Sequence, residues 1–166
     1  GVICDINPEN AYFLHHALEI IRTSKNRFDF VEKICKFVKS NSIIGFQANL
    51  SENPIYQSIT SSPENEIRVE LDKKGSWLAS DGAFEHIKKL ALGDKIALVT
   101  EDIQNTAVFE SMKRVLQDNN IQVDSLYVSN IDLYVEKDPF LQTVKCLSEE
   151  ETIIIAASGD IFDDLK

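Results

Sequence analysis

Short apolar runs alternate with longer amphipathic segments along most of this chain. Four runs have the length and composition of strands: 2–4, 96–99, 126–128 and 153–156. Alternation of short strands with helices is typical of a parallel α/β sheet. The pattern therefore predicts an α/β fold over residues 1–166 as a single domain, in which one mainly parallel, Rossmann-like sheet carries helices on both faces.

Helix-start signals support this alternation. Asn7-Pro8-Glu9 combines an N-cap residue, a first-turn proline and an acid, and Ser80-Asp81 is a similar start. The predicted helices cover about 8–22, 27–38, 81–91, 106–118 and 139–147. The start of the fourth is assigned to Asn105 or Thr106, and that of the fifth to Asp138-Pro139.

Residues 40–75 interrupt the alternation. This stretch is rich in Ser, Asn, Pro and Glu and has weak periodicity, so we expect an irregular excursion within the domain, with a short strand over Ile67–Leu71. Stretches of this kind are either mobile connections or lids and binding loops, and the sequence leaves both open.

Charge limits the partners that the chain can bind. The net charge is −10 at pH 7, with −1 over residues 1–75 and −9 over residues 76–166. An acidic half repels phosphate groups, so we expect neither nucleic acid nor an anionic membrane surface as a partner. A solubilising acidic surface accounts for the same charge.

The cysteines and the absence of targeting segments indicate a cytoplasmic protein. Cys4, Cys35 and Cys146 are far apart and form no C-x-x-C motif, which is typical of reduced thiols. No apolar run approaches the length of a membrane span, and no signal-peptide pattern opens the chain. The chain does not begin with Met, and we expect it to be the carboxyl-terminal part of a longer protein.

Polar residues follow the predicted strands at their carboxyl ends, where open α/β sheets bind ligands. Asp5 could accept hydrogen bonds from both hydroxyls of a ribose, or bond the backbone of its own turn. Asp102 could accept from the exocyclic amine of a base, or cap the helix that follows. Ser129 and Asn130 could hold a substrate amine or hydroxyl, or form an ordinary turn.

Other residue types narrow the chemistry. Trp77, the single tryptophan, suits either core packing or a wall beside an adenine ring. His15 and His16 are adjacent and point to different sides of a helix, so we expect no metal site. No Gly-rich loop follows any of the predicted strands, so neither a P-loop nor a complete G-x-G-x-x-G motif is present.

Three segments carry a resemblance to a known family: Val2–Ile6, Ser76–Ser80 and Leu126–Ile131. They resemble a family of uncharacterised bacterial proteins with an S-adenosylmethionine methyltransferase-like Rossmann fold. The resemblance implies that the first strand of the fold and its Gly-rich cofactor loop lie upstream of Gly1.

The same resemblance implies roles for the strand-end residues. Asp5 would be the ribose-binding acid and Asp102 would lie near the adenine of S-adenosylmethionine, whereas Ser129 and Asn130 would face the substrate. We therefore expect an S-adenosylmethionine-dependent methyltransferase-like protein in which Asn130 orients a small-molecule or protein acceptor. The alternative is a non-catalytic Rossmann-like module that binds protein partners through its acidic half.

Overall fold

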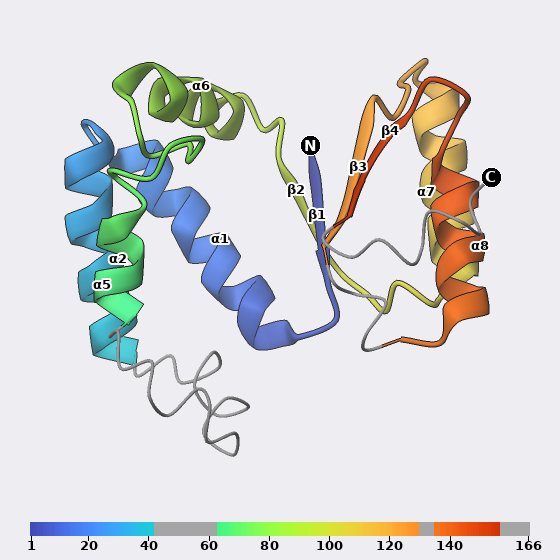
Figure 1. Ribbon diagram of the computed structural model, residues 1–166, viewed down its shortest axis with the longest axis horizontal. Coiled ribbons are helices and arrows are strands. Elements are labelled where there is room, and N and C mark those ends of the chain that lie inside the picture. Colours follow the sequence, from blue (N-terminus) through green and yellow to red (C-terminus); the bar gives the residue numbers. More distant parts are fainter. Residues whose placement is uncertain (42–62, 130–134, 157–166) are drawn as a thin grey trace. The chain divides into compact units, whose positions relative to one another are not determined.

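The computed structural model describes residues 1–41, 63–129 and 135–156 (Figure 1). It divides into two compact units. Unit 1 comprises Gly1–Ile3 with Asn7–Thr100, and unit 2 comprises Cys4–Ile6 with Glu101–Lys166. Each unit combines helices with strands, so the predicted mixed α/β class is confirmed.

Strand β1 (Val2–Asp5) pairs in parallel with β2 (Ala97–Thr100). The amide of Ala97 donates to the Gly1 carbonyl at 2.9 Å, and the amide of Glu101 donates to the Asp5 carbonyl at 3.2 Å. The pairing therefore runs the full length of both strands and brings their carboxyl ends to one edge.

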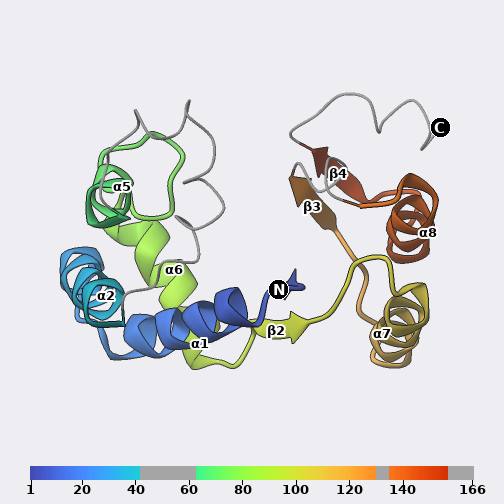
Figure 2. The same ribbon diagram turned by 90° about the horizontal axis from the view of Figure 1, so that it is seen from below.

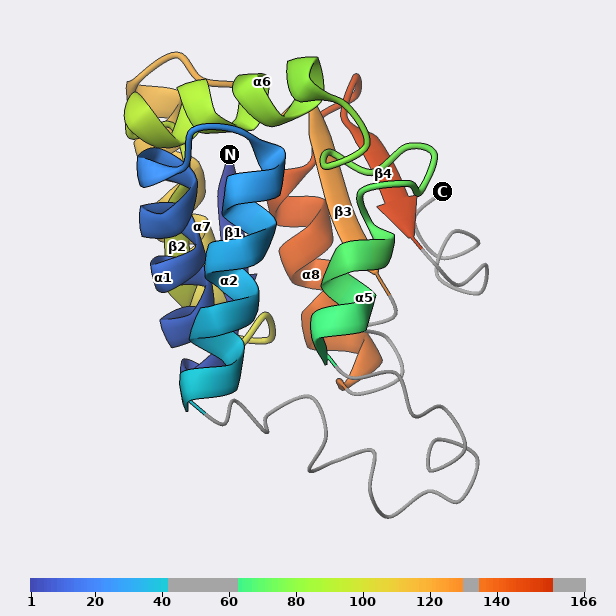
Figure 3. The same ribbon diagram turned by 90° about the vertical axis from the view of Figure 1, so that its left-hand side faces the viewer.

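The residues described between these strands form four helices of unit 1. They are α1 (Pro8–Thr23), α2 (Arg27–Asn41), α5 (Pro63–Val69) and α6 (Asp81–Leu92). Figure 3 shows α2 between α1 and α5, and α2 contacts both. Two predicted starts are confirmed, because the Asn7 side chain accepts the Glu9 amide and the Ser80 hydroxyl accepts the Ala83 amide.

The core of unit 1 is built from the apolar faces of α1, α2 and α6. Its buried members are Leu18, Ile21, Phe30, Val31, Ile34, Cys35, Leu78, Phe84 and Ala91. Trp77 packs against this core, with its ring centroid 5.2 Å from that of Phe30 and 6.0 Å from that of Phe84. The tryptophan therefore serves the packing role that the sequence left open.

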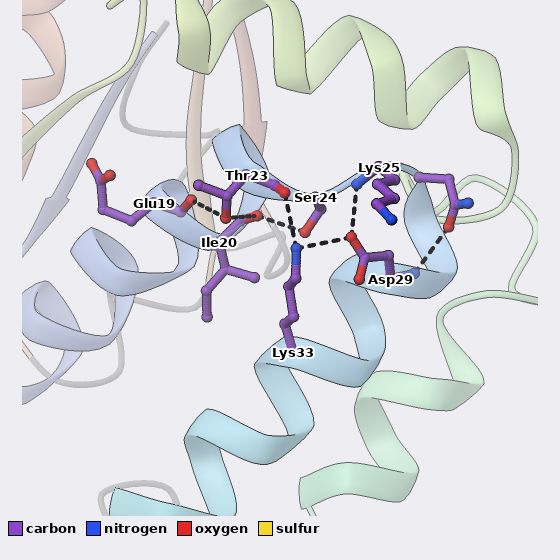
Figure 4. A network of polar contacts seen from close by, with 8 residues as sticks. Glu19, Ile20, Thr23, Ser24, Lys25, Asp29 and Lys33 are labelled. Atoms are coloured by element: carbon purple, nitrogen blue, oxygen red, sulfur yellow. Dashed lines mark hydrogen bonds and ion pairs between the residues drawn. The ribbon is translucent and has the colours of Figure 1, made fainter.

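A polar network fixes the junction between α1 and α2 (Figure 4). The Asp29 carboxylate accepts the Lys25 amide at 2.7 Å and the Lys33 ammonium at 2.9 Å. Lys33 also donates to the Thr23 carbonyl near the end of α1, at 2.9 Å. The hydrogen bond from Lys33, followed by that from the Lys25 amide, lowers the pKa of the Asp29 carboxyl.

Replacing Asp29→Asn should lower the melting temperature at pH 7, because the ionised carboxylate is the acceptor for both donors. The folded-state pKa of Asp29 is depressed, so its contribution is present above the unfolded pKa of about 3.9 and is lost as the pH falls through the folded pKa. Thermal unfolding between pH 2 and pH 7 tests this, with Asp72→Asn, an exposed aspartate, as the control. A melting-temperature difference that persists unchanged at pH 2 would contradict the linkage.

Unit 2 contains a second parallel pair of strands. Strand β3 (Ser125–Ser129) lies beside β4 (Ile153–Ala156), with Ser125 opposite Ile153 and an irregularity between Tyr127 and Ser129. Helices α7 (Thr106–Asp118) and α8 (Lys137–Leu147) pack together on one side of this pair (Figure 2). The buried residues between helices and strands are Val128, Phe140, Leu141 and Val144.

One polar group of this core is unsatisfied. Thr143 on α8 is fully buried, and its hydroxyl has no hydrogen-bond partner among the described residues. A buried hydroxyl without a partner retains its cost of desolvation.

Replacing Thr143→Val removes that hydroxyl at nearly constant volume and should raise the free energy of unfolding by about 1 kcal/mol. Urea unfolding of both proteins measures this difference. Thr106→Val, on the half-buried first residue of α7, is a matched control in which no such gain is expected. A loss of stability in Thr143→Val would show that the hydroxyl is satisfied in solution.

The four predicted strands and their parallel pairing are confirmed, whereas one continuous sheet is not formed by the described residues. Strand β1 pairs with β2 and β3 pairs with β4, which gives two sheets of two strands. The prediction of a single domain over 1–166 stays a prediction. Of the predicted excursion over 40–75, residues 42–62 lie outside the described residues.

Two local predictions were wrong. The expected strand over Ile67–Leu71 is helical up to Val69, because Ile67 and Leu71 are four residues apart and both pack on the unit 1 core from one side. The predicted helix start at Asp138-Pro139 was also wrong, because α8 begins at Lys137 with Glu136 as its N-cap residue. Asn105 occupies the N-cap position of α7, as predicted, but its side chain makes no capping hydrogen bond.

Candidate functional site

Four half-buried residues gather at the carboxyl ends of β1 and β2, all within unit 2. They are Cys4, Asp5, Glu101 and Asp102. The Asp5 carbonyl accepts the Glu101 amide, and the Cys4 thiol donates to the Glu101 carbonyl at 3.4 Å. Parallel pairing causes this convergence, since the residues that follow both strands emerge at the same edge. The structure thus brings Asp5 and Asp102 to one rim, as the sequence predicts.

The pKa of the Cys4 thiol reflects the electrostatics of this rim. Burial raises the pKa of Cys4, a backbone hydrogen bond with Glu101 opposes this rise, and the nearby carboxylates of Asp5, Glu101 and Asp102 raise the pKa further. The thiol is therefore held in its neutral form, and the rim presents carboxylate oxygens. Such a rim suits ligands that donate hydrogen bonds or carry positive charge.

The Asp102 carboxylate organises the loop that follows β2. It accepts the Gln104 backbone amide at 2.9 Å and the Gln104 side-chain amide at 3.3 Å. The Gln104 side-chain carbonyl in turn accepts the Glu136 amide at 2.7 Å, next to the start of α8. This geometry favours a turn-forming role for Asp102. That role resembles helix capping, but the hydrogen bonds go to the loop before α7 and not to α7 itself.

Gln104 is a residue that sequence reasoning missed. Its link to Asp102 has a local signal, because an aspartate that bonds the amide two residues on forms a common turn. Its link to Glu136 joins positions 32 residues apart and has no signal in a single sequence. Gln104 therefore couples the rim at β2 to the beginning of α8.

The other two predicted site residues are placed differently. Ser129 is the last residue of β3 and pairs with Ala156 of β4, so it belongs to the second sheet. Asn130 lies outside the described residues. A shared site that contains Asp5, Asp102, Ser129 and Asn130 stays a prediction.

Within the described ranges, no group of three or more His, Cys, Asp or Glu side chains could hold a metal ion. His16 stacks on Phe37 with 4.8 Å between ring centroids, and its Nδ1 lies 2.9 Å from the Tyr12 carbonyl. Among the helices that the structure describes, none is both long and apolar enough to cross a membrane.

Comparison with protein families identifies the family to which the chain belongs. Residues 1–161 match the model of a domain of unknown function, DUF7790, and the chain belongs to that family. No curated protein matches the chain. The family assignment covers both units and carries no activity with it.

Replacing Asp102→Ala should lower the free energy of unfolding by about 1 kcal/mol, because the Gln104 amide loses its acceptor. Urea unfolding measures the change, with Asp72→Ala as the exposed control. Unchanged stability would show that the Asp102 carboxylate is not needed for the loop and would favour a role reserved for ligands.

Proposed function

We propose that this chain is an S-adenosylmethionine-dependent methyltransferase-like protein built on a Rossmann-like sheet, with a small-molecule or protein acceptor. The observation that supports this proposal most is the pairing of the strands, β1 with β2 and β3 with β4, both parallel. The acceptor-rich rim at the ends of β1 and β2 is the second support.

The strand pairs fit the order of a doubly wound sheet. In the common order 3-2-1-4-5-6, the second strand pairs with the third and the fourth pairs with the fifth. If β1 to β4 are the second to fifth strands, both observed pairs follow.

The rim supplies the chemistry that this cofactor needs. An acid at the end of the second strand accepts hydrogen bonds from ribose hydroxyls in dinucleotide-binding folds. Asp5, the last residue of β1, would take that position if β1 is the second strand. The carboxylates of Glu101 and Asp102 add negative potential, which suits a sulfonium cation.

In the proposed mechanism, methyl transfer depends on in-line positioning and exclusion of water more than on a strong acid or base. Ser129, the last residue of β3, and Asn130, the next residue in the sequence, would orient the acceptor. No step requires a metal ion.

The second candidate function is a non-catalytic module that binds protein partners. The charge distribution favours it, since unit 2 holds 15 of the 27 acidic residues and only 5 of the 17 basic ones. Unit 1 holds 12 of each, so the whole net charge of −10 belongs to unit 2. A large field of one sign speeds association with a partner of opposite charge.

Calorimetric titration with S-adenosylmethionine distinguishes the two functions. The protein as its natural gene encodes it should bind the cofactor, and Asp5→Ala should weaken binding about tenfold or more through loss of charge-assisted hydrogen bonds. The melting temperature of the Asp5→Ala variant should stay nearly equal to that of the wild type. The 166-residue chain should bind at least about two orders of magnitude more weakly, because it lacks a Gly-rich loop after any strand.

Asp72→Ala serves as the matched control for a lost surface carboxylate. Equal affinity of wild type and Asp5→Ala would remove the ribose role, and a large loss of stability would assign Asp5 to its turn. Absence of binding by the natural protein would favour the non-catalytic module.

A further inference from the structure

The two faces of the β3–β4 pair differ in how they are covered. Side chains alternate along a strand, and the register aligns Leu126 with Ile154 on one face and Tyr127 with Ile155 on the other. The first face packs against Phe140, Leu141 and Val144, together with Val128. Helices α7 and α8 both lie on that side in Figure 2.

The opposite face is apolar and exposed. Tyr127 is 68% exposed, Ile153 is 64% exposed and Ile155 is 48% exposed, whereas Val128 on the covered face is 2% exposed. We call Tyr127, Ile153 and Ile155 the open face. Parallel sheets are normally covered on both faces, and a contiguous apolar patch marks an interaction site.

A concentration of negative charge borders the open face. At the beginning of β3 and β4 there is a cavity of about 370 Å³ whose acidic lining residues are Asp124, Glu149, Glu150 and Glu151. Lys113 pairs with Glu149 at 2.6 Å, and the described residues form no salt bridge with the other three carboxylates. Thr152, which also lines the cavity, directly precedes Ile153 of the open face.

We propose that the open face and this acidic cavity together form a docking surface for a basic amphipathic helix of a partner protein. The apolar side of such a helix would cover Tyr127, Ile153 and Ile155, and its Lys or Arg residues would reach the unpaired carboxylates. Helices that lay an apolar face on a hydrophobic surface are a recurrent mode of recognition, and complementary charge fixes their orientation.

The described helices of unit 2, α7 and α8, do not fit this role. The apolar residues Phe140, Leu141 and Val144 of α8 are buried in the core of unit 2. Helix α7 packs along α8, on the covered side of the sheet. The net charge of unit 2 also disfavours an anionic membrane or a nucleic acid as the occupant. The inference does not require that the chain bind S-adenosylmethionine.

The probe is a synthetic amphipathic helix of about 18 residues made of Leu and Lys, which spans about 27 Å. Its binding to the fluorescence-labelled 166-residue chain is measured at low and high salt. A peptide with Glu in place of Lys tests charge, and a scrambled Leu/Lys peptide tests the apolar face. We expect that only the Leu/Lys helix binds, and that high salt weakens its binding.

Two double variants test the surface itself. Ile153→Thr with Ile155→Thr keeps β-branched residues in β4 and should raise the dissociation constant at least about tenfold. Glu150→Gln with Glu151→Gln should raise it about three- to tenfold at low salt and little at high salt. Val115→Thr, an exposed apolar residue of α7 away from the open face, should leave it unchanged.

Circular dichroism confirms that each variant is folded before binding is compared. Equal affinity of wild type and the Ile153/Ile155 variant would overturn the proposal, as would equal binding of the acidic or scrambled peptide. Sedimentation of the wild type without peptide measures whether the chain dimerises. Dimers that disappear in the Ile153/Ile155 variant would assign the open face to a second copy of this chain and would also overturn the proposal.

Discussion

The parallel pairing of β1 with β2 is the constraint on which the candidate site depends. A parallel pair cannot be closed by a tight turn, so a long connection must return the chain to the starting edge. Here that connection contains α1, α2, α5 and α6, whose apolar faces make the core of unit 1. The same return brings the carboxyl ends of both strands together, which is why Asp5 and Asp102 emerge side by side in unit 2.

Local signals in the sequence were sufficient for most elements. The caps at Asn7 and Ser80 predicted the starts of α1 and α6, because a side-chain oxygen before an amphipathic run satisfies an otherwise unbonded amide. The segment around Ile67 and Leu71 misled, since two apolar residues in a polar stretch fit a short strand as well as one face of a helix. The helix is favoured because it brings both Ile67 and Leu71 into contact with the unit 1 core.

Long-range features had no comparable signal. The sequence predicted that Asp5 and Asp102 share a rim, because that follows from parallel strands alone. It did not predict the bridge from Gln104 to Glu136, the thiol of Cys4 among three carboxylates, or the division of the strands into two sheets. These features depend on which strands become neighbours, and apolar runs identify strands without specifying their order.

We expect the carboxyl ends of β1 and β2 to form the binding site for S-adenosylmethionine. Chemical-shift mapping by nuclear magnetic resonance tests it most directly, with cofactor added to the isotope-labelled protein as its natural gene encodes it. The largest shifts should fall on the amides of Asp5, Glu101 and Asp102. Shifts confined to the beginnings of the strands, such as those around Val2 and Ala97, would contradict it.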